Sequence, residues 1–187
     1  MKNVKISILI ALAFIFSISS CKKKDDNPTP LKTFSFNTAS DLTVELSWTV
    51  NGEADGHNYV DLDFFIDNEV TQPSYIIDYR STNDDLIESI NFPTSADNKT
   101  YYIGFIYCGN MGKISKLTAP YTIKYTIKVY APSYPNDAQT FTGTLKTPDA
   151  SPDIYKIYNQ MLLVKSASDF TFTEIRPKTT FIAPYFL

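Results

Sequence analysis

Leu42–Val50 reads LTVELSWTV, and every second residue of this stretch is apolar. Successive side chains of a β-strand point to opposite faces, so a period of two predicts a strand with one buried face and one face in water. Tyr121–Val129 repeats the pattern, with threonine and lysine at the alternating polar positions. Two long half-buried strands of this kind fit a sandwich in which two sheets cover each other.

Other strand-like stretches lie on either side of these two, separated by turn signals such as Asn51-Gly52. They are Thr33–Asn37, Val60–Ile66, Ser74–Tyr79, Glu88–Phe92, Thr100–Cys108 and Thr140–Lys146. Many short strands at this spacing predict an all-β fold, a jelly-roll-like two-sheet β-sandwich of about 8–10 strands. The high content of tyrosine and phenylalanine agrees with a strand-rich chain.

Two stretches have a second interpretation. The acidic start of Asn83–Ile90 suits the cap of a single helical turn, but we favour a loop followed by a short strand. Ile154–Leu162 keeps helical spacing behind an acidic cap. Leu162–Lys165 and Phe170–Ile175 flank a turn, however, so we expect residues 153–187 to form a terminal hairpin and a tail.

The first 20 residues form a separate segment. Lys2 and Lys5 precede the apolar run Ile6–Ile18, and small residues follow it. This is the layout of a secretory signal peptide, and about 13 apolar residues are too few for the roughly 20 that cross a bilayer. We therefore expect residues 1–20 to be removed on export.

Ile18–Cys21 reads ISSC, an aliphatic residue and two small residues ahead of a cysteine. The motif resembles the lipobox of bacterial lipoproteins, which implies that the sulfur of Cys21 receives a diacylglyceryl group. Acyl chains hold a protein on a membrane because each buried CH₂ contributes about 0.8 kcal/mol. The alternative is an ordinary signal peptide with an incidental cysteine.

The residues after Cys21 form a charged, proline-containing tether, which we assign to 21–32. Lys24-Asp25-Asp26 resembles the surface-export signal of Bacteroidetes-type lipoproteins, which implies an outer-membrane protein that faces outward. A solvated spacer is the alternative, and Pro28 and Pro30 extend it. Residues 33–187 then suit a single β-sandwich domain.

Charge and cysteine content exclude some partners. Loss of Lys2 and Lys5 would lower the formal charge from −3 by two, to −5, which argues against nucleic acid as a partner. If Cys21 is acylated, only Cys108 remains and no intramolecular disulfide can form. We expect Cys108 to be a small buried residue of its strand.

A second resemblance covers roughly residues 40–130. Val60–Phe65 reads VDLDFF and follows Leu46-Ser47-Trp48, while Glu88-Ser89-Ile90 precedes Tyr101–Phe105, which reads YYIGF. These stretches are similar to strands of bacterial pre-peptidase C-terminal-type jelly-roll domains, although the usual glycine-rich turn after the aspartate strand is replaced. The resemblance implies a non-catalytic accessory or adhesion-like sandwich.

Few residues suit catalysis. His57 is the only histidine and stands in a polar loop, where we expect it to be solvated. A catalytic triad needs a nucleophile and an acid close to the histidine, and zinc catalysis needs several ligands. We therefore predict that the chain is not an enzyme. A carboxylate-based envelope hydrolase is the alternative, but any two of 20 acidic residues could form such a pair.

Calcium is the one cofactor for which residues can be named. Asp55, Asp61 and Asp63 lie close in sequence, and the last two point the same way from the polar face of one strand. Calcium takes about six to eight oxygen ligands, of which these carboxylates would supply part. A calcium-stabilised accessory domain of a surface complex is therefore an alternative function, and the same aspartates can equally serve solubility.

Exposed tyrosines would suit a glycan or protein ligand, although most tyrosines of a β-domain pack in its interior. The candidates are Tyr79, Tyr101, Tyr107, Tyr134 and Tyr155. We therefore predict a cell-envelope lipoprotein that displays a non-catalytic binding or structural β-domain from the outer membrane.

Overall fold

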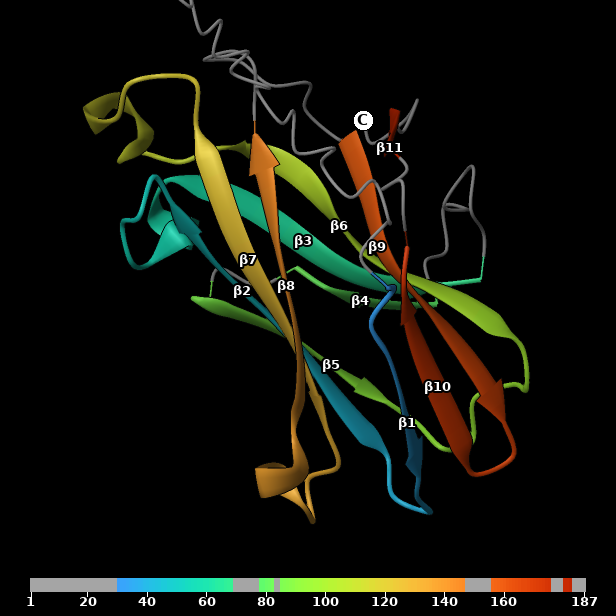
Figure 1. Cartoon of the computed structure of the whole chain (residues 1–187). Helices are drawn as coiled ribbons and strands as arrows, with labels where there is room; N and C mark the ends of the chain where they lie inside the picture. Colours follow the sequence, from blue (N-terminus) through green and yellow to red (C-terminus); the bar gives the residue numbers. More distant parts are fainter. Residues whose placement is uncertain (1–29, 69–77, 83–84, 147–155, 176–179, 183–187) are drawn as a thin grey trace, which may run out of the picture. The chain divides into compact units, whose positions relative to one another are not determined.

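A computed structural model of the chain describes residues 30–68, 78–82, 85–146, 156–175 and 180–182. The chain divides at Pro30, and all the described strands belong to the second unit, Leu31–Leu187. As predicted, this second unit is all-β: two antiparallel sheets pack against each other as a β-sandwich (Figure 1). The helices of the described ranges are single 3-10 turns, η1 (Gly56–Asn58), η2 (Ile114–Lys116) and η3 (Pro135–Asp137).

The larger sheet has six strands in a row and a short seventh, β11 (Thr180–Ile182), which pairs with β9. The order of the six is β1 (Thr33–Asn37), β10 (Asp169–Glu174), β9 (Lys156–Ser166), β6 (Thr100–Asn110), β3 (Val60–Asp67) and β4 (Tyr79–Ser81). The smaller sheet has the order β5 (Ile87–Phe92), β2 (Leu42–Val50), β7 (Thr122–Tyr130) and β8 (Gln139–Lys146). Residues 74–77 of the predicted strand Ser74–Tyr79 fall outside the described residues, and β4 begins at its last residue, Tyr79.

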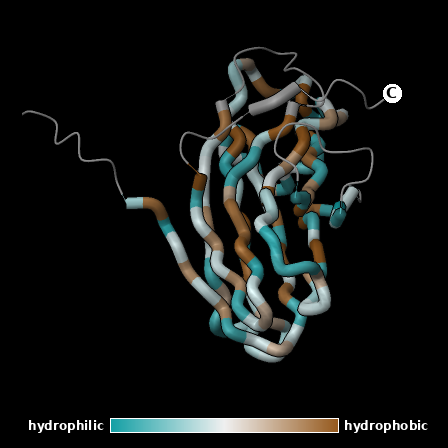
Figure 2. Tube along the Cα trace, turned by 90° about the vertical axis from the view of Figure 1, so that its right-hand side faces the viewer, coloured by the Kyte–Doolittle hydropathy of each residue, from teal (hydrophilic) through white to brown (hydrophobic). Residues whose placement is uncertain are grey.

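The alternation that predicts the two long strands is confirmed. Every second residue of β2 is buried, and β7 alternates in the same way beside it, with Leu46 opposite Ile127. Figure 2 shows hydrophobic and hydrophilic residues alternating along the strands. The indole N–H of Trp48 donates to the carbonyl oxygen of Val60 at 3.0 Å, which ties β2 to the start of β3 in the other sheet.

The predicted C-terminal hairpin is confirmed and consists of β9 and β10. The helical alternative for Ile154–Leu162 is wrong from Lys156 onward, because β9 begins there. The helical spacing has a simple cause. The register between β6 and β9 shifts so that Gly104 faces Asn159 and Ile103 faces Met161, which leaves Gln160 as an extra residue. Because of this bulge, Tyr158 and Met161 both face the core three residues apart, as they would in a helix.

The centre of the larger sheet is buried on both faces. Val60, Leu62 and Phe64 of β3 point into the core between the sheets. Phe65 of β3 and Ile106 of β6 belong to the opposite face, yet they are 1% and 0% exposed. This face of the larger sheet, which we call the outer face, carries the predicted aspartates Asp61 and Asp63.

Candidate functional site

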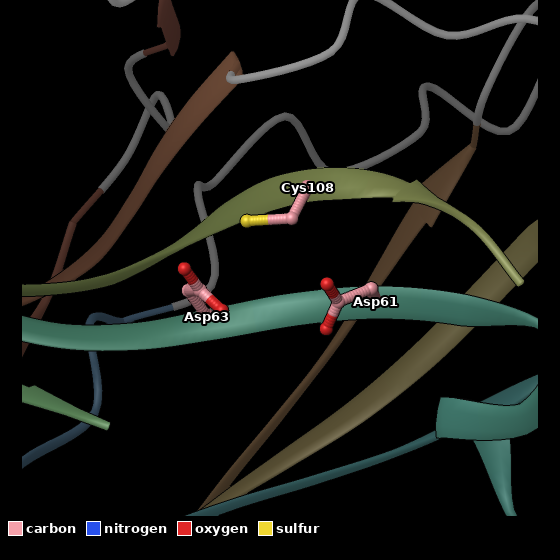
Figure 3. Close-up of side chains that lie close together, drawn as sticks. All are labelled: Asp61, Asp63 and Cys108. Atoms are coloured by element: carbon pink, nitrogen blue, oxygen red, sulfur yellow. The ribbon is translucent and has the colours of Figure 1, made fainter. Parts of the chain in front are cut away.

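Two of the three aspartates predicted as calcium ligands are brought together, and a cysteine joins them. One donor atom each from Asp61, Asp63 and Cys108 lies within 4.8 Å of the other two. Figure 3 shows the two carboxylates on β3 and the thiol on the neighbouring strand β6, close to one another. We call these three residues the acidic–thiol cluster.

A bulge places the cysteine in this cluster. Asp61 faces Gly109 and Leu62 faces Tyr107, so Cys108 is an extra residue between two paired positions of β6. Leu62 and Tyr107 both keep their places in the core. The bulge therefore allows the thiol to share the outer face with Asp61 and Asp63, a re-aiming that bulges commonly produce.

The cluster is more enclosed than the sequence predicts. We expected Asp63 on a solvated strand face, but it is only 7% exposed because the centre of the larger sheet is covered on both faces. Its carboxylate forms an ion pair with the guanidinium of Arg80, on the edge strand β4. A buried carboxylate needs such a partner, since an unpaired buried charge is costly.

The thiol of Cys108 is kept neutral by its surroundings. Burial, followed by the charges of Asp63 and Asp61, raises the pKa of this thiol well above its usual value. The thiol also donates a long hydrogen bond to the carbonyl oxygen of Ile106 at 3.7 Å. A protonated thiol is a poor nucleophile, so this environment does not favour cysteine-based catalysis.

His57 lies next to the cluster, and the expectation that it is solvated is wrong. It belongs to η1, packs with its ring centroid 6.3 Å from that of Trp48, and is 8% exposed. Its Nδ1 lies 3.9 Å from Oδ1 of Asp61 and has no hydrogen-bond partner. The histidine therefore approaches the cluster through Asp61.

Asp55, the third predicted calcium ligand, lies elsewhere. It is exposed and lines a groove of about 660 Å³ over the smaller sheet, and it is not a member of the acidic–thiol cluster. The groove is lined by side chains of β2, β7 and β8 that point away from the core, among them Ser47, Thr49, Lys124, Thr126, Thr142 and Thr144. Hydroxyl groups that both donate and accept hydrogen bonds therefore line part of its floor, beside apolar atoms of residues such as Trp48 and Leu86.

The tyrosines considered for ligand binding divide clearly. Tyr101 and Tyr107 are core residues, and Tyr79 packs against the core. Tyr134 is 61% exposed and lines a smaller hollow of about 300 Å³ with Asp137. Tyr155 falls outside the described residues.

The predicted lipid-attachment residue, Cys21, also falls outside the described residues, so its acylation stays a prediction. Within the described ranges, none of the helices combines the length and the apolar character needed to cross a bilayer. Comparisons with known protein families, with curated proteins and with solved structures find no match for this chain.

Sequence reasoning found Asp61 and Asp63 but missed His57 and Cys108 as their neighbours. His57 and Asp61 are four residues apart in the sequence, but this spacing brings their side chains together only because the 3-10 turn η1 precedes β3. The register that puts Cys108 beside the aspartates depends on a bulge between two strands that lie far apart in the chain. Alternation within one strand indicates which face a side chain occupies, but not which residue of another strand it meets across a bulge.

Proposed function

We propose that this chain is an outer-membrane lipoprotein, anchored through Cys21, whose β-sandwich binds a glycan without catalysing a reaction. The support for the anchor is the sequence ISSC at Ile18–Cys21 and the charged tether that follows it. The support for a displayed binding domain is a sandwich whose first strand, β1, begins at Thr33, directly after the predicted tether.

The observation that carries the binding function is the groove over the smaller sheet. Its volume of about 660 Å³ lies in the range of ligand sites, about 300–1,000 Å³. Hydroxyl side chains on β2, β7 and β8 offer donors and acceptors in rows, and Lys124 and Asp55 add a charge of each sign. A ligand rich in hydroxyl groups, such as an oligosaccharide, can exchange its hydrogen bonds with water for bonds to these rows.

Binding is tested by filling the groove. Thr144→Arg places a long side chain over its floor, and we expect loss of oligosaccharide binding on a glycan array and in titration calorimetry. Thr140→Arg is the matched control, because Thr140 is exposed on the same strand and the same face but does not line the groove. Equal binding by both variants, or binding only to proteins in a pull-down, would contradict the glycan proposal.

The anchor is tested separately by labelling cells with a fatty-acid analogue. Wild-type chain should carry the label, and Cys21→Ala should lose it. Replacement of Asp25 and Asp26 by alanine should keep the label but abolish access of an external protease to the chain on intact cells. A labelled Cys21→Ala chain would show that the lipobox interpretation is wrong.

A further inference from the structure

The acidic–thiol cluster and His57 together present four metal-binding groups of three types near one end of β3. Asp61 and Asp63 are two residues apart on the strand, Cys108 comes from the bulge of β6, and His57 comes from η1. Carboxylate, thiol and imidazole are the three side-chain types that bind zinc in proteins.

The histidine is an observation independent of the cluster. Its side chain is more than nine-tenths buried, and its Nδ1 is buried without a hydrogen-bond partner. Buried polar atoms are nearly always hydrogen-bonded, so an unsatisfied one calls for an explanation such as an ion that the atom would bind. This nitrogen is directed at the carboxylate of Asp61, at 3.9 Å.

The spacing suits a tetrahedral ion. With metal–nitrogen and metal–oxygen bonds of about 2.0–2.2 Å, two ligand atoms of a tetrahedral zinc ion lie roughly 3.4 Å apart. The His57–Asp61 separation exceeds this by about half an ångström. The three cluster donors lie within 4.8 Å of one another, so their side chains must rotate to close each gap by up to about 1.4 Å. His57 is not part of that group, so its ring must move toward the cluster from its place beside Asp61.

The charges also suit a divalent ion. A thiolate and two carboxylates carry three negative charges, so a bound divalent cation leaves one in excess. The guanidinium of Arg80, paired with Asp63, neutralises that charge and holds the carboxylate in place. The thiol counts as a thiolate in this sum because a coordinating cysteine is deprotonated outright.

We propose that His57, Asp61, Asp63 and Cys108 form a zinc site. Its two softer donors select zinc over calcium, which prefers oxygen ligands alone. Four protein ligands fill a tetrahedral coordination sphere, which is the mark of a structural rather than a catalytic site. The ion would fasten η1 to the bulged end of the β3–β6 pair.

The test uses the full-length chain, purified with detergent, stripped with a chelator and loaded with Zn²⁺ alone. We expect one zinc per chain by elemental analysis after gel filtration, unchanged by millimolar Ca²⁺. Co²⁺ in place of Zn²⁺ should give the near-ultraviolet charge-transfer absorption of a thiolate–metal bond. Cys21→Ala should keep this absorption, because the proposed thiolate comes from Cys108.

Cys108→Ser should abolish the charge-transfer band, and His57→Gln should weaken zinc binding by about tenfold or more, as even second-shell changes can. Asp55→Asn is the matched control and should bind zinc as the wild type does, because Asp55 lies outside the cluster. Circular dichroism confirms that each variant keeps its strands. Folded wild-type chain that retains no zinc, or a Cys108→Ser chain that keeps the cobalt band, would overturn the proposal.

Discussion

The position of η1 can be tested at Gly56, where the chain passes directly over Trp48. A Cβ atom added to Gly56 would lie 2.8 Å from the carbonyl carbon of Trp48, and still closer to the carbonyl oxygen and to indole Cδ1. Neither neighbour can easily move. The carbonyl belongs to β2, which is paired with β7 at this position, and the indole is held by its hydrogen bond to Val60.

Gly56→Ala should therefore destabilise the protein near the upper end of the range for overpacked cores, by about 3 kcal/mol. For a folded unit of this size each kcal/mol lowers the melting temperature by roughly 2–4 °C, so we expect a fall of about 6–12 °C. The displaced turn should also move His57 away from Asp61 and weaken zinc binding.

Urea unfolding followed by tryptophan fluorescence measures this effect cleanly, because Trp48 is the only tryptophan and is 4% exposed. The midpoint should fall while the slope with urea stays constant. Gly112→Ala is the matched control, since nothing lies within 4 Å of a Cβ added there. If the two variants differ by less than about 0.5 kcal/mol, the size of an ordinary surface change, the close packing of η1 on Trp48 is refuted.

Three further predictions concern other parts of the unit. Met161→Ala removes a fully buried side chain beside the bulge of β9 and should cost about 2–5 kcal/mol in chemical unfolding. The backbone N–H of Thr94 donates to Asp41 at 2.8 Å and lowers the pKa of that carboxyl. The Asp41 carboxyl therefore binds a proton more weakly in the folded state than in the unfolded state. The hydrogen bond stabilises the fold fully above the unfolded pKa of about 3.9, and this stabilisation is lost as pH falls through the lower folded pKa. Asp41→Asn should therefore lower the free energy of unfolding at neutral pH. It should also make the difference in stability between neutral pH and about pH 3 smaller than in the wild type, as measured by urea midpoints. Zn²⁺ at about 100 times its Kd should raise the free energy of unfolding by about 2.7 kcal/mol in wild type and by much less in Cys108→Ser, as judged by calorimetry.

The sandwich could be predicted because the order of apolar and polar residues in its long strands indicates which face of each strand is buried. Alternation in Leu42–Val50 and Thr122–Tyr130 is the direct result of one buried face, and the structure keeps it residue by residue. The prediction fails where a strand is buried on both faces, as at Asp63 and Phe65, or where a bulge changes its period, as between Tyr158 and Met161.

The sequence alone determined that the chain is all-β and where its main strands lie, and it predicts a lipid anchor at Cys21. Only the tertiary structure decided which groups meet. Cys108 joins Asp61 and Asp63 through the register of two strands far apart in the chain, and His57 comes within 3.9 Å of Asp61 because η1 packs on Trp48. The physical reason is that alternation within a strand indicates whether a side chain is buried. Which side chains lie next to it depends on the pairing and the bulges between strands, which the residues of one strand do not show.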